Sequence, residues 1–179
     1  MKTKLCLLIL LIVGLSVQLS ANPINGLLER IDKGASKKFV IEFKKGADDF
    51  FELDQKGTKV VVRGNNYVNI ATGINWYLKY YAGIQLSWNG MQAKLPQVLP
   101  PVPRKERHET SLSLRYDFNY CTYSYTMAFW DWERWEKEID WMALHGINLP
   151  LAAVGQECIW FNMLQKLGYS KDEINRFIA

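Results

Sequence analysis

Residues 131–154 have the sequence DWERWEKEIDWMALHGINLPLAAV, in which a helical pattern passes directly into a strand pattern. Asp131 can cap a helix. Apolar residues then recur three to four positions apart, on one helical face, at Trp132, Trp135, Ile139 and Met142. Gly146 ends this helix, and the apolar run Ile147–Val154 predicts a strand that is covered on both faces. The stretch therefore predicts a helix–strand unit of an α/β protein.

The flanking sequence extends this unit in both directions. Leu112–Phe118 alternates as a strand, and Cys158–Leu167 resumes a helix after the break at Gly155-Gln156-Glu157. Ser170 begins another helix, because Ser170 and Glu173 have the spacing of a capping box. Strand, helix, strand and helix joined by short turns predict a βαβα unit of a parallel sheet or barrel.

The length of this region is too small for a closed barrel. A (β/α)8 barrel needs about 250 residues, whereas Ser111 to Ala179 comprise 69. A two-stranded unit cannot by itself bury both faces of Ile147–Val154. We therefore expect residues 111–179 to be the first βαβα units of a truncated (β/α)8 TIM barrel, and the chain to be a fragment.

Residues 22–94 predict a separate, small N-terminal α+β domain. Asn22 can cap a helix that has Pro23 at its first position and ends at Gly34. The further predicted elements are a strand at Phe39–Phe43, a hairpin formed by Phe50–Asp54 and Thr58–Arg63, and a helix over Val68–Tyr81. The fold class is thus α/β, with this domain preceding the start of the barrel.

Residues 95–110 contain four of the six prolines, followed by a basic run. Such a stretch does not enter a helix interior or a central strand. We expect it to be a proline-rich linker between the two domains, with a solvated basic run and with His108 inside it.

The first 21 residues predict a signal peptide. Two lysines lie in Met1–Lys4, an apolar stretch covers Leu5–Val17, and Leu19-Ser20-Ala21 offers a cleavage site. The alternative is a membrane anchor, but the apolar stretch of about 13 residues is shorter than the roughly 20 that span a bilayer. We expect an exported protein, periplasmic or secreted, with no membrane attachment after cleavage.

Composition excludes several classes of protein. With 49% hydrophobic and 22% charged residues, the chain is not disordered. Loss of Lys2 and Lys4 with the signal peptide leaves 20 basic and 18 acidic residues, so a nucleic-acid partner is not expected. The remaining cysteines, Cys121 and Cys158, are too few for a disulfide scaffold, although a bridge between them stays open. No metal-ligand cluster or glycine-rich phosphate loop is present, so we expect no metal and no cofactor.

Two loops are candidates for function, because the active sites of barrels lie at the carboxyl ends of their strands. The first runs from Asn119 to Phe129 and the second is Gly155-Gln156-Glu157. Amides, hydroxyls and aromatic rings suit a sugar, whose hydroxyl groups need hydrogen-bond partners and whose C–H faces stack on rings.

The individual residues leave alternatives open. Trp132 and Trp135 suit helix-to-barrel packing, whereas Trp130 and Trp160 suit packing or sugar contact equally. Cys121 could be a nucleophile, but His108 and His145 are poorly placed to activate it. Glu157 is a single carboxylate where glycoside hydrolysis normally uses two, which favours a structural or substrate-positioning role.

Three segments carry a resemblance to a known family: RYDFNYCTYSYT at 115–126, WDWERWEKEIDWMALHGIN at 130–148, and GQE at 155–157. They closely resemble the α-N-acetylglucosaminidases of glycoside hydrolase family 89. Residues 23–103 look like that family's small N-terminal α/β domain. The departures from the family are Pro150, which interrupts the second strand, and His145, where relatives often have a polar residue.

The resemblance implies a retaining exo-hydrolase that removes terminal α-linked N-acetylglucosamine from heparan sulfate or mucin-type glycans. It implies two catalytic glutamates on later barrel strands, so no residue of this chain is assigned a catalytic role. Asn119 and Cys121 match positions that line the family's sugar pocket, and Gln156 and Glu157 match its second-strand GQE. The expected partner is a glycan with terminal N-acetylglucosamine.

We therefore expect the N-terminal part of such an enzyme, inactive by itself. The alternative is a non-catalytic glycan-binding module, which would bind N-acetylglucosamine saturably and melt cooperatively.

Overall fold

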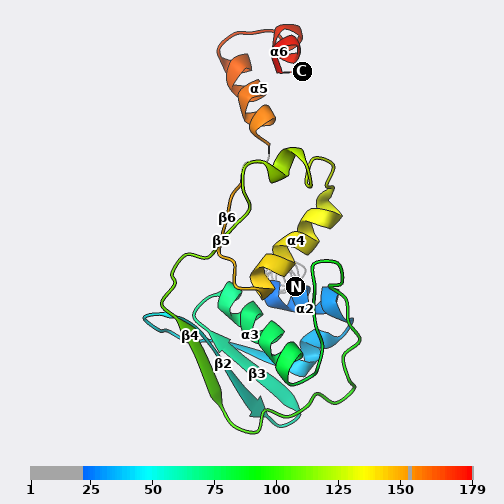
Figure 1. Cartoon of the computed structure of the whole chain (residues 1–179), viewed down its shortest axis with the longest axis vertical. Helices are drawn as coiled ribbons and strands as arrows, with labels where there is room; N and C mark the ends of the chain where they lie inside the picture. Colours follow the sequence, from blue (N-terminus) through cyan, green and yellow to red (C-terminus); the bar gives the residue numbers. More distant parts are fainter. Residues whose placement is uncertain (1–21, 153–154, 179) are drawn as a thin grey trace, which may run out of the picture.

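The computed structural model describes residues 22–152 and 155–178, so the signal-peptide prediction lies outside the described residues. Figure 1 shows a sheet with helices on it, followed by a second group of helices and short strands. The elements are α2 (Pro23–Ile31), the 3₁₀ turn η1 (Ala35–Lys38), β1 (Phe39–Phe43), β2 (Asp49–Lys56), β3 (Lys59–Gly64), α3 (Tyr67–Tyr80), β4 (Glu106–Thr110), β5 (Tyr116–Asp117), the 3₁₀ turn η2 (Thr122–Ser124), α4 (Trp132–Leu144), β6 (Leu149–Pro150), α5 (Gln156–Lys166) and α6 (Lys171–Ile178).

The N-terminal sheet has four strands in the order β1-β3-β2-β4. β1 is parallel to β3, and β2 is antiparallel to both β3 and β4. The β2–β3 hairpin turns at Gly57, whose φ of 59° lies in the left-handed region that glycine adopts without steric cost. The predicted hairpin is confirmed.

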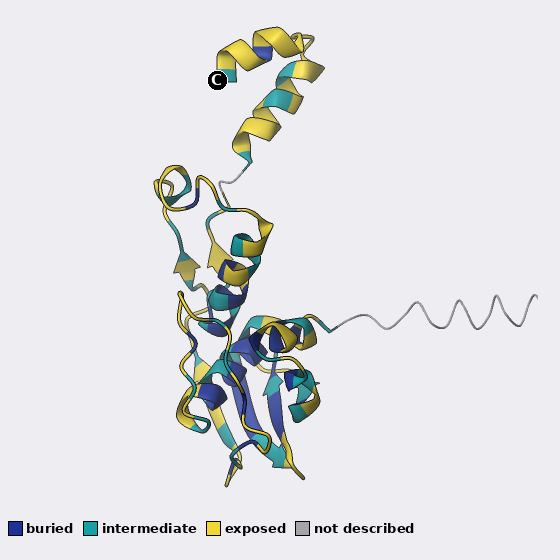
Figure 2. Ribbon diagram, turned by 90° about the vertical axis from the view of Figure 1, so that its right-hand side faces the viewer, coloured by how far each residue is buried: buried dark blue, intermediate teal, exposed yellow. Residues whose placement is uncertain are grey.

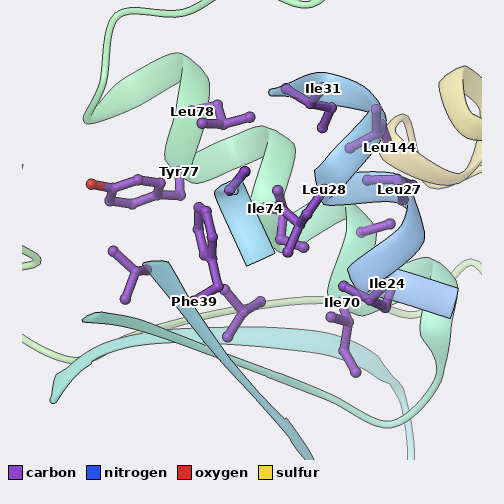
Figure 3. Close-up of a cluster of buried hydrophobic side chains, with 14 of the residues drawn as sticks. Ile24, Leu27, Leu28, Ile31, Phe39, Ile70, Ile74, Tyr77, Leu78 and Leu144 are labelled. Atoms are coloured by element: carbon purple, nitrogen blue, oxygen red, sulfur yellow. The ribbon is translucent and has the colours of Figure 1, made fainter. Parts of the chain in front are cut away.

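The core lies between this sheet and the helices α2 and α3 (Figure 3). Side chains alternate along β2, so Phe51 and Leu53 point into the core while Glu52 lies on the opposite face. The helix α3 lies close against the sheet at Gly73, where an added Cβ would lie 2.9 Å from a methyl carbon of Val62. Figure 2 shows the buried residues concentrated in this layer, whereas α5 and α6 are largely exposed.

The linker prediction is wrong for the end of residues 95–110. Residues 106–110 form β4, an edge strand of the N-terminal sheet whose register pairs Glu106 with Leu53. The last proline of the segment is Pro103, so all residues of β4 can join the ladder. The earlier, proline-rich part packs on the N-terminal domain, because Leu95, Leu99 and Val102 are buried in its core.

The predicted helix after Asp131 is confirmed, and its cap is the predicted one. The Asp131 side chain accepts a hydrogen bond from Arg134 N at 2.9 Å, and Gly146 follows the helix with a φ of 80°. The strands on either side are shorter than predicted. Only Tyr116–Asp117 of the first and Leu149–Pro150 of the second pair with each other, in parallel.

Leu149, in the described part of the second strand, is exposed, which agrees with the expectation that a two-stranded unit cannot by itself cover both faces of this strand. Among the described strands, β6 pairs with β5 alone, and a two-stranded sheet leaves strand faces exposed to solvent. Residues 153 and 154 of the predicted strand lie outside the described residues.

The face by which α4 packs differs from the prediction. Trp132 and Ile139, expected to pack inward, are exposed. Met142 of the predicted face is buried, and the other buried residues of α4 are Glu138, Asp140 and Leu144. The two carboxylates can be buried because residues distant in sequence pair with them: Arg30 forms a two-pronged ion pair with Asp140, at 2.6 and 2.7 Å.

The capping box at the start of α6 is confirmed, since Glu173 N donates to Ser170 Oγ while the Glu173 carboxylate accepts from Ser170 N at 2.9 Å. Ile174 is buried in the α5–α6 pair. Across residues 22–152 and 155–178, none of the helices has both the length and the apolar character needed to cross a membrane.

Candidate functional site

The parallel pairing of β5 and β6 brings two candidate loops to one edge. We call residues 118–130 the β5 loop and the described residues 151, 152 and 155 the β6 loop. Because the strands are parallel, both loops leave from the same end of the pair. The Tyr123 hydroxyl donates a hydrogen bond to the Leu151 carbonyl oxygen, which ties the two loops together. The edge is thus the one where barrel enzymes place their active sites.

Asn119 orders the first turn of the β5 loop. Its Oδ1 accepts hydrogen bonds from Cys121 N at 2.9 Å and Thr122 N at 3.2 Å, and its carbonyl oxygen accepts from Thr122 Oγ1 at 2.8 Å. Among the described residues, none accepts a hydrogen bond from Asn119 Nδ2. The structure therefore places Asn119 and Cys121 together in one exposed turn, with a carboxamide donor available to a ligand.

Replacing Asn119 with alanine removes the acceptor of two backbone donors. We expect amide hydrogen exchange at Cys121 and Thr122 to become about fivefold faster, the equivalent of about 1 kcal/mol for a lost cap. Nuclear magnetic resonance of the exchanging amides measures this. Asn119→Asp, which keeps an acceptor oxygen, is the matched control and should exchange at nearly the original rate. Equal exchange in the alanine variant and the original chain would contradict the role given to Asn119.

Phe118 is a residue that sequence reasoning missed, because the pattern made it the end of a strand. Its φ of 72° is an uncommon conformation for a bulky residue. Asp117 Oδ1 accepts a hydrogen bond from Phe118 N at 2.8 Å, and the Phe118 ring packs edge-on against Tyr123 and Trp135. This conformation turns the chain sharply between β5 and Asn119, and a strained backbone of this kind is frequent at functional sites.

The tryptophans divide into packed and exposed groups. The Trp135 ring stacks on Tyr123 with centroids 6.3 Å apart and meets Trp130 edge-on at 5.0 Å. Trp132 and Trp160 are exposed. Trp135 therefore packs, as expected, but it packs against the β5 loop.

Gln156 and Glu157 lie in the first turn of α5, after Gly155 with a φ of 81°. Both side chains are exposed, and Glu157 lines a shallow pocket with Cys158 and Phe161. Among the described residues, no hydrogen bond or ion pair joins these two side chains to Asn119 or Cys121. The structure thus places the four predicted site residues after the same edge of the strands but brings only the first two into contact.

Neither histidine serves the cysteines. Cys121 and Cys158 are both free and exposed. His108 lies in β4, where its ring packs on Phe51 and Trp76, and His145 Nδ1 is hydrogen-bonded to the Trp141 carbonyl oxygen at 2.8 Å. The described residues also contain no group of three or more His, Cys, Asp or Glu side chains that could hold a metal ion.

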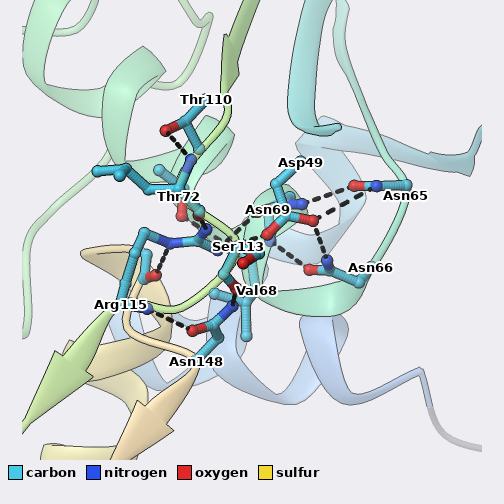
Figure 4. Close-up of polar contacts among 12 residues, drawn as sticks. Asp49, Asn65, Asn66, Val68, Asn69, Thr72, Thr110, Ser113, Arg115 and Asn148 are labelled. Carbon is cyan, nitrogen blue, oxygen red and sulfur yellow. Dashed lines mark hydrogen bonds and ion pairs between the residues drawn. The ribbon is translucent and has the colours of Figure 1, made fainter. Parts of the chain in front are cut away.

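A partly buried polar network holds the start of β5 and β6 against the N-terminal domain (Figure 4). Arg115 Nη2 donates to Asp49 Oδ2 at 2.8 Å and to Asn69 Oδ1 at 3.3 Å, while Arg115 N donates to Asn148 Oδ1 at 2.8 Å. Burial acts to raise the pKa of Asp49, but the hydrogen bonds from Arg115 and Asn69 outweigh it, and the pKa is lowered. The ion pair between Arg115 and Asp49 therefore anchors the start of β5 to the N-terminal domain.

Comparisons with known proteins agree with this architecture. Residues 22–101 match the family described as "Alpha-N-acetylglucosaminidase (NAGLU) N-terminal domain", and residues 115–179 match the "Alpha-N-acetylglucosaminidase (NAGLU) tim-barrel domain". The chain belongs to the α-N-acetylglucosaminidase family. Within this family, human α-N-acetylglucosaminidase is 42% identical over 148 residues, which is 83% of this chain and 20% of the human protein.

Solved structures of a family 89 glycoside hydrolase from Clostridium perfringens are also similar. The structure in complex with PUGNAc has a TM-score of 0.80 and 39% identity, covering 86% of this chain and 18% of that one. A variant in complex with its substrate GlcNAc-α-1,4-galactose matches with the same values. The chain therefore spans about a fifth of the length of these α-N-acetylglucosaminidase relatives. The fold class is confirmed: a small N-terminal α/β domain is followed by part of a TIM barrel, in a family of glycoside hydrolases.

Proposed function

We propose that this chain is the N-terminal part of an exo-acting α-N-acetylglucosaminidase, which hydrolyses terminal α-linked N-acetylglucosamine from heparan sulfate or mucin-type glycans with retention. The observation that carries the proposal is the match, at a TM-score of 0.80 and 39% identity, to a hydrolase solved with its substrate GlcNAc-α-1,4-galactose. The proposed partner is a glycan, not a nucleic acid or a membrane. The proposed location is outside the cytoplasm, periplasmic or secreted, with residues 1–21 as the signal peptide.

The geometry of the β5 loop supports a contribution to a sugar site. The Asn119 turn is exposed, and its Nδ2 donates no hydrogen bond to the described residues. Tyr120 and Tyr125 are exposed in the same loop. A free amide donor beside aromatic rings fits both the hydroxyl groups and the C–H faces of a pyranose.

The carboxylates at the carboxyl ends of β5 and β6 do not support catalysis by the chain alone. A retaining glycosidase needs two carboxyl groups about 5 Å apart. Asp117 Oδ1 is engaged by Phe118 N, and Glu157 lies at the exposed start of α5, where its charge favours the helix dipole. The proposed roles of Asn119, Cys121, Gln156 and Glu157 are therefore in substrate binding.

We expect the purified 179-residue chain to release no chromophore from a chromogenic α-N-acetylglucosaminide above the blank. Turnover by the chain would contradict the assignment of the catalytic pair to residues outside it.

Sequencing the DNA after codon 179 tests the family assignment separately, because the proposal expects a continuation with six further strand–helix repeats. The non-catalytic alternative instead predicts saturable binding of N-acetylglucosamine by the isolated chain.

A further inference from the structure

The N-terminal domain reaches α4 through Trp88. This residue lies in the turn between Ser87 and Gly90, whose backbones exchange two hydrogen bonds of 3.0 Å. Its indole Nε1 donates to Glu138 Oε2 at 2.5 Å, 50 residues further along the chain. Glu138 is only 2% exposed. A buried carboxylate is costly unless it is hydrogen-bonded, so Glu138 needs this donor.

Arg134 completes the surroundings of Glu138. Its Nη2 donates to the same carboxylate oxygen at 2.8 Å, one helical turn away. Its guanidinium carbon lies 3.9 Å from the ring centre of Trp130 and 4.8 Å from that of Trp88. A guanidinium group within about 6 Å of an indole face is attracted by the ring quadrupole. We call Trp88, Trp130, Arg134 and Glu138 the Trp88 cluster.

Trp130, Arg134 and Glu138 stand four residues apart and therefore form one stripe of the helix and its entry. The sequence pattern of α4 predicts only a charged face for Arg134 and Glu138. In the structure these two side chains contact the indole of Trp88, from the N-terminal domain. The ion pair Glu133–Lys137 on the same helix is exposed and, among the described residues, has no aromatic ring from the N-terminal domain against it. It is an ordinary surface ion pair.

The cluster is continuous with the candidate sugar loop. Trp130 ends the β5 loop, and its backbone N donates to the Met127 carbonyl oxygen at 3.1 Å. Its ring meets Trp135, which stacks on Tyr123, and Tyr123 packs against Phe118 beside Asn119. A chain of packed rings thus runs from the N-terminal domain to the turn that holds Asn119.

From this continuity we infer that Trp88 is a positioning residue: the N-terminal domain orders the β5 loop by holding Arg134 and Trp130 in place. Loss of the indole leaves Glu138 without its neutral donor and Arg134 without one of its two rings. Both changes loosen Trp130 and, through Trp135, the Asn119 turn. The consequence for glycan binding rests on the proposed function, whereas the ordering of the loop does not.

The test is amide hydrogen exchange on the 179-residue chain with Trp88→Ala. Three amides of the β5 loop are reporters, because Ser124, Met127 and Trp130 each donate a backbone hydrogen bond within the loop. We expect their exchange to be about tenfold faster or more, since a hydrogen bond to a charged group is lost together with a ring contact. Amides of β2 and β3 serve as the internal reference and should keep their rates.

Two further variants keep the outcome decisive. Trp132→Ala removes an exposed indole from the same helix and should leave the reporters unchanged. Trp88→Phe keeps a ring over Arg134 but not the donor to Glu138, and should accelerate the reporters less than Trp88→Ala. Unchanged reporters in Trp88→Ala, or equal acceleration of β2, β3 and the loop in both Trp88 variants, would overturn the inference.

Titration with N-acetylglucosamine separates this inference from the proposed function. If the original chain binds the sugar, Trp88→Ala should weaken the binding. An unchanged affinity in Trp88→Ala, together with faster exchange in the β5 loop, would contradict a role of Trp88 in the sugar site. If the original chain does not bind the sugar but the loop still loosens, the positioning role of Trp88 stands without a sugar site in this chain.

Discussion

Replacing Leu144 with alanine is expected to lower the free energy of unfolding by about 3 kcal/mol. Leu144 belongs to α4, yet its side chain is 0% exposed and lies in the same cluster as Leu28 of α2 and Ile74 of α3 (Figure 3). The substitution removes apolar contacts and leaves a cavity at the point where the partial barrel joins the N-terminal domain.

Urea denaturation followed by circular dichroism measures this loss as a lower midpoint with an unchanged slope. Leu167→Ala is the matched control, since Leu167 is 67% exposed and its truncation should change the free energy of unfolding by less than about 0.5 kcal/mol. A loss below about 1 kcal/mol for Leu144→Ala would mean that α4 is not part of the N-terminal core.

Acid is expected to destabilise the chain through Glu52. This carboxylate is 2% exposed and meets three cations, Lys44 at 2.8 Å, Lys105 at 2.9 Å and Arg107 at 3.1 Å. Burial acts to raise its pKa, but the hydrogen bonds from the three cations prevail and lower the pKa to about 2. The pKa of the unfolded chain is the ordinary 4.5. The ionised form therefore stabilises the fold fully above pH 4.5, and this stabilisation is lost as the pH falls from 4.5 to about 2.

A difference of this size corresponds to about 3 kcal/mol of stability at neutral pH. We expect Glu52→Gln to be less stable at pH 7 and to lose less stability between pH 5 and pH 2, measured by urea denaturation across that range. Glu133→Gln, at a side chain that is 77% exposed, should follow the pH dependence of the original chain. An equally steep loss of stability in Glu52→Gln would show that the group responsible is another carboxylate.

Features that depend on adjacent residues were predictable from the sequence. The caps at Asn22 and Asp131 hold the bonds their residue types favour, at 3.0 Å to Ile24 N and 2.9 Å to Arg134 N. The hairpin around Gly57 formed where the glycine permits its turn. The family could be recognised for the same reason, because the motif residues follow one another in the chain.

The candidate site was predictable in part. Asn119 and Cys121 share one turn, so their contact follows from their spacing in the sequence. The left-handed backbone of Phe118 was not predictable, because it is held by Asp117 and by packing on Trp135, not by its own conformational preference. The link from Trp88 to Glu138 spans 50 residues and carries no local signal.

Local sequence thus specified the helices, their caps, the hairpin and the glycan-hydrolase family. Tertiary structure decided that residues 106–110 complete a sheet and that α4 buries Glu138 and Asp140 while Trp132 stays exposed. The physical reason is that an edge strand needs a free neighbouring strand and a buried carboxylate needs a cation or donor. Those partners, β2 for the strand and Arg30 and Trp88 for the carboxylates, come from distant parts of the chain.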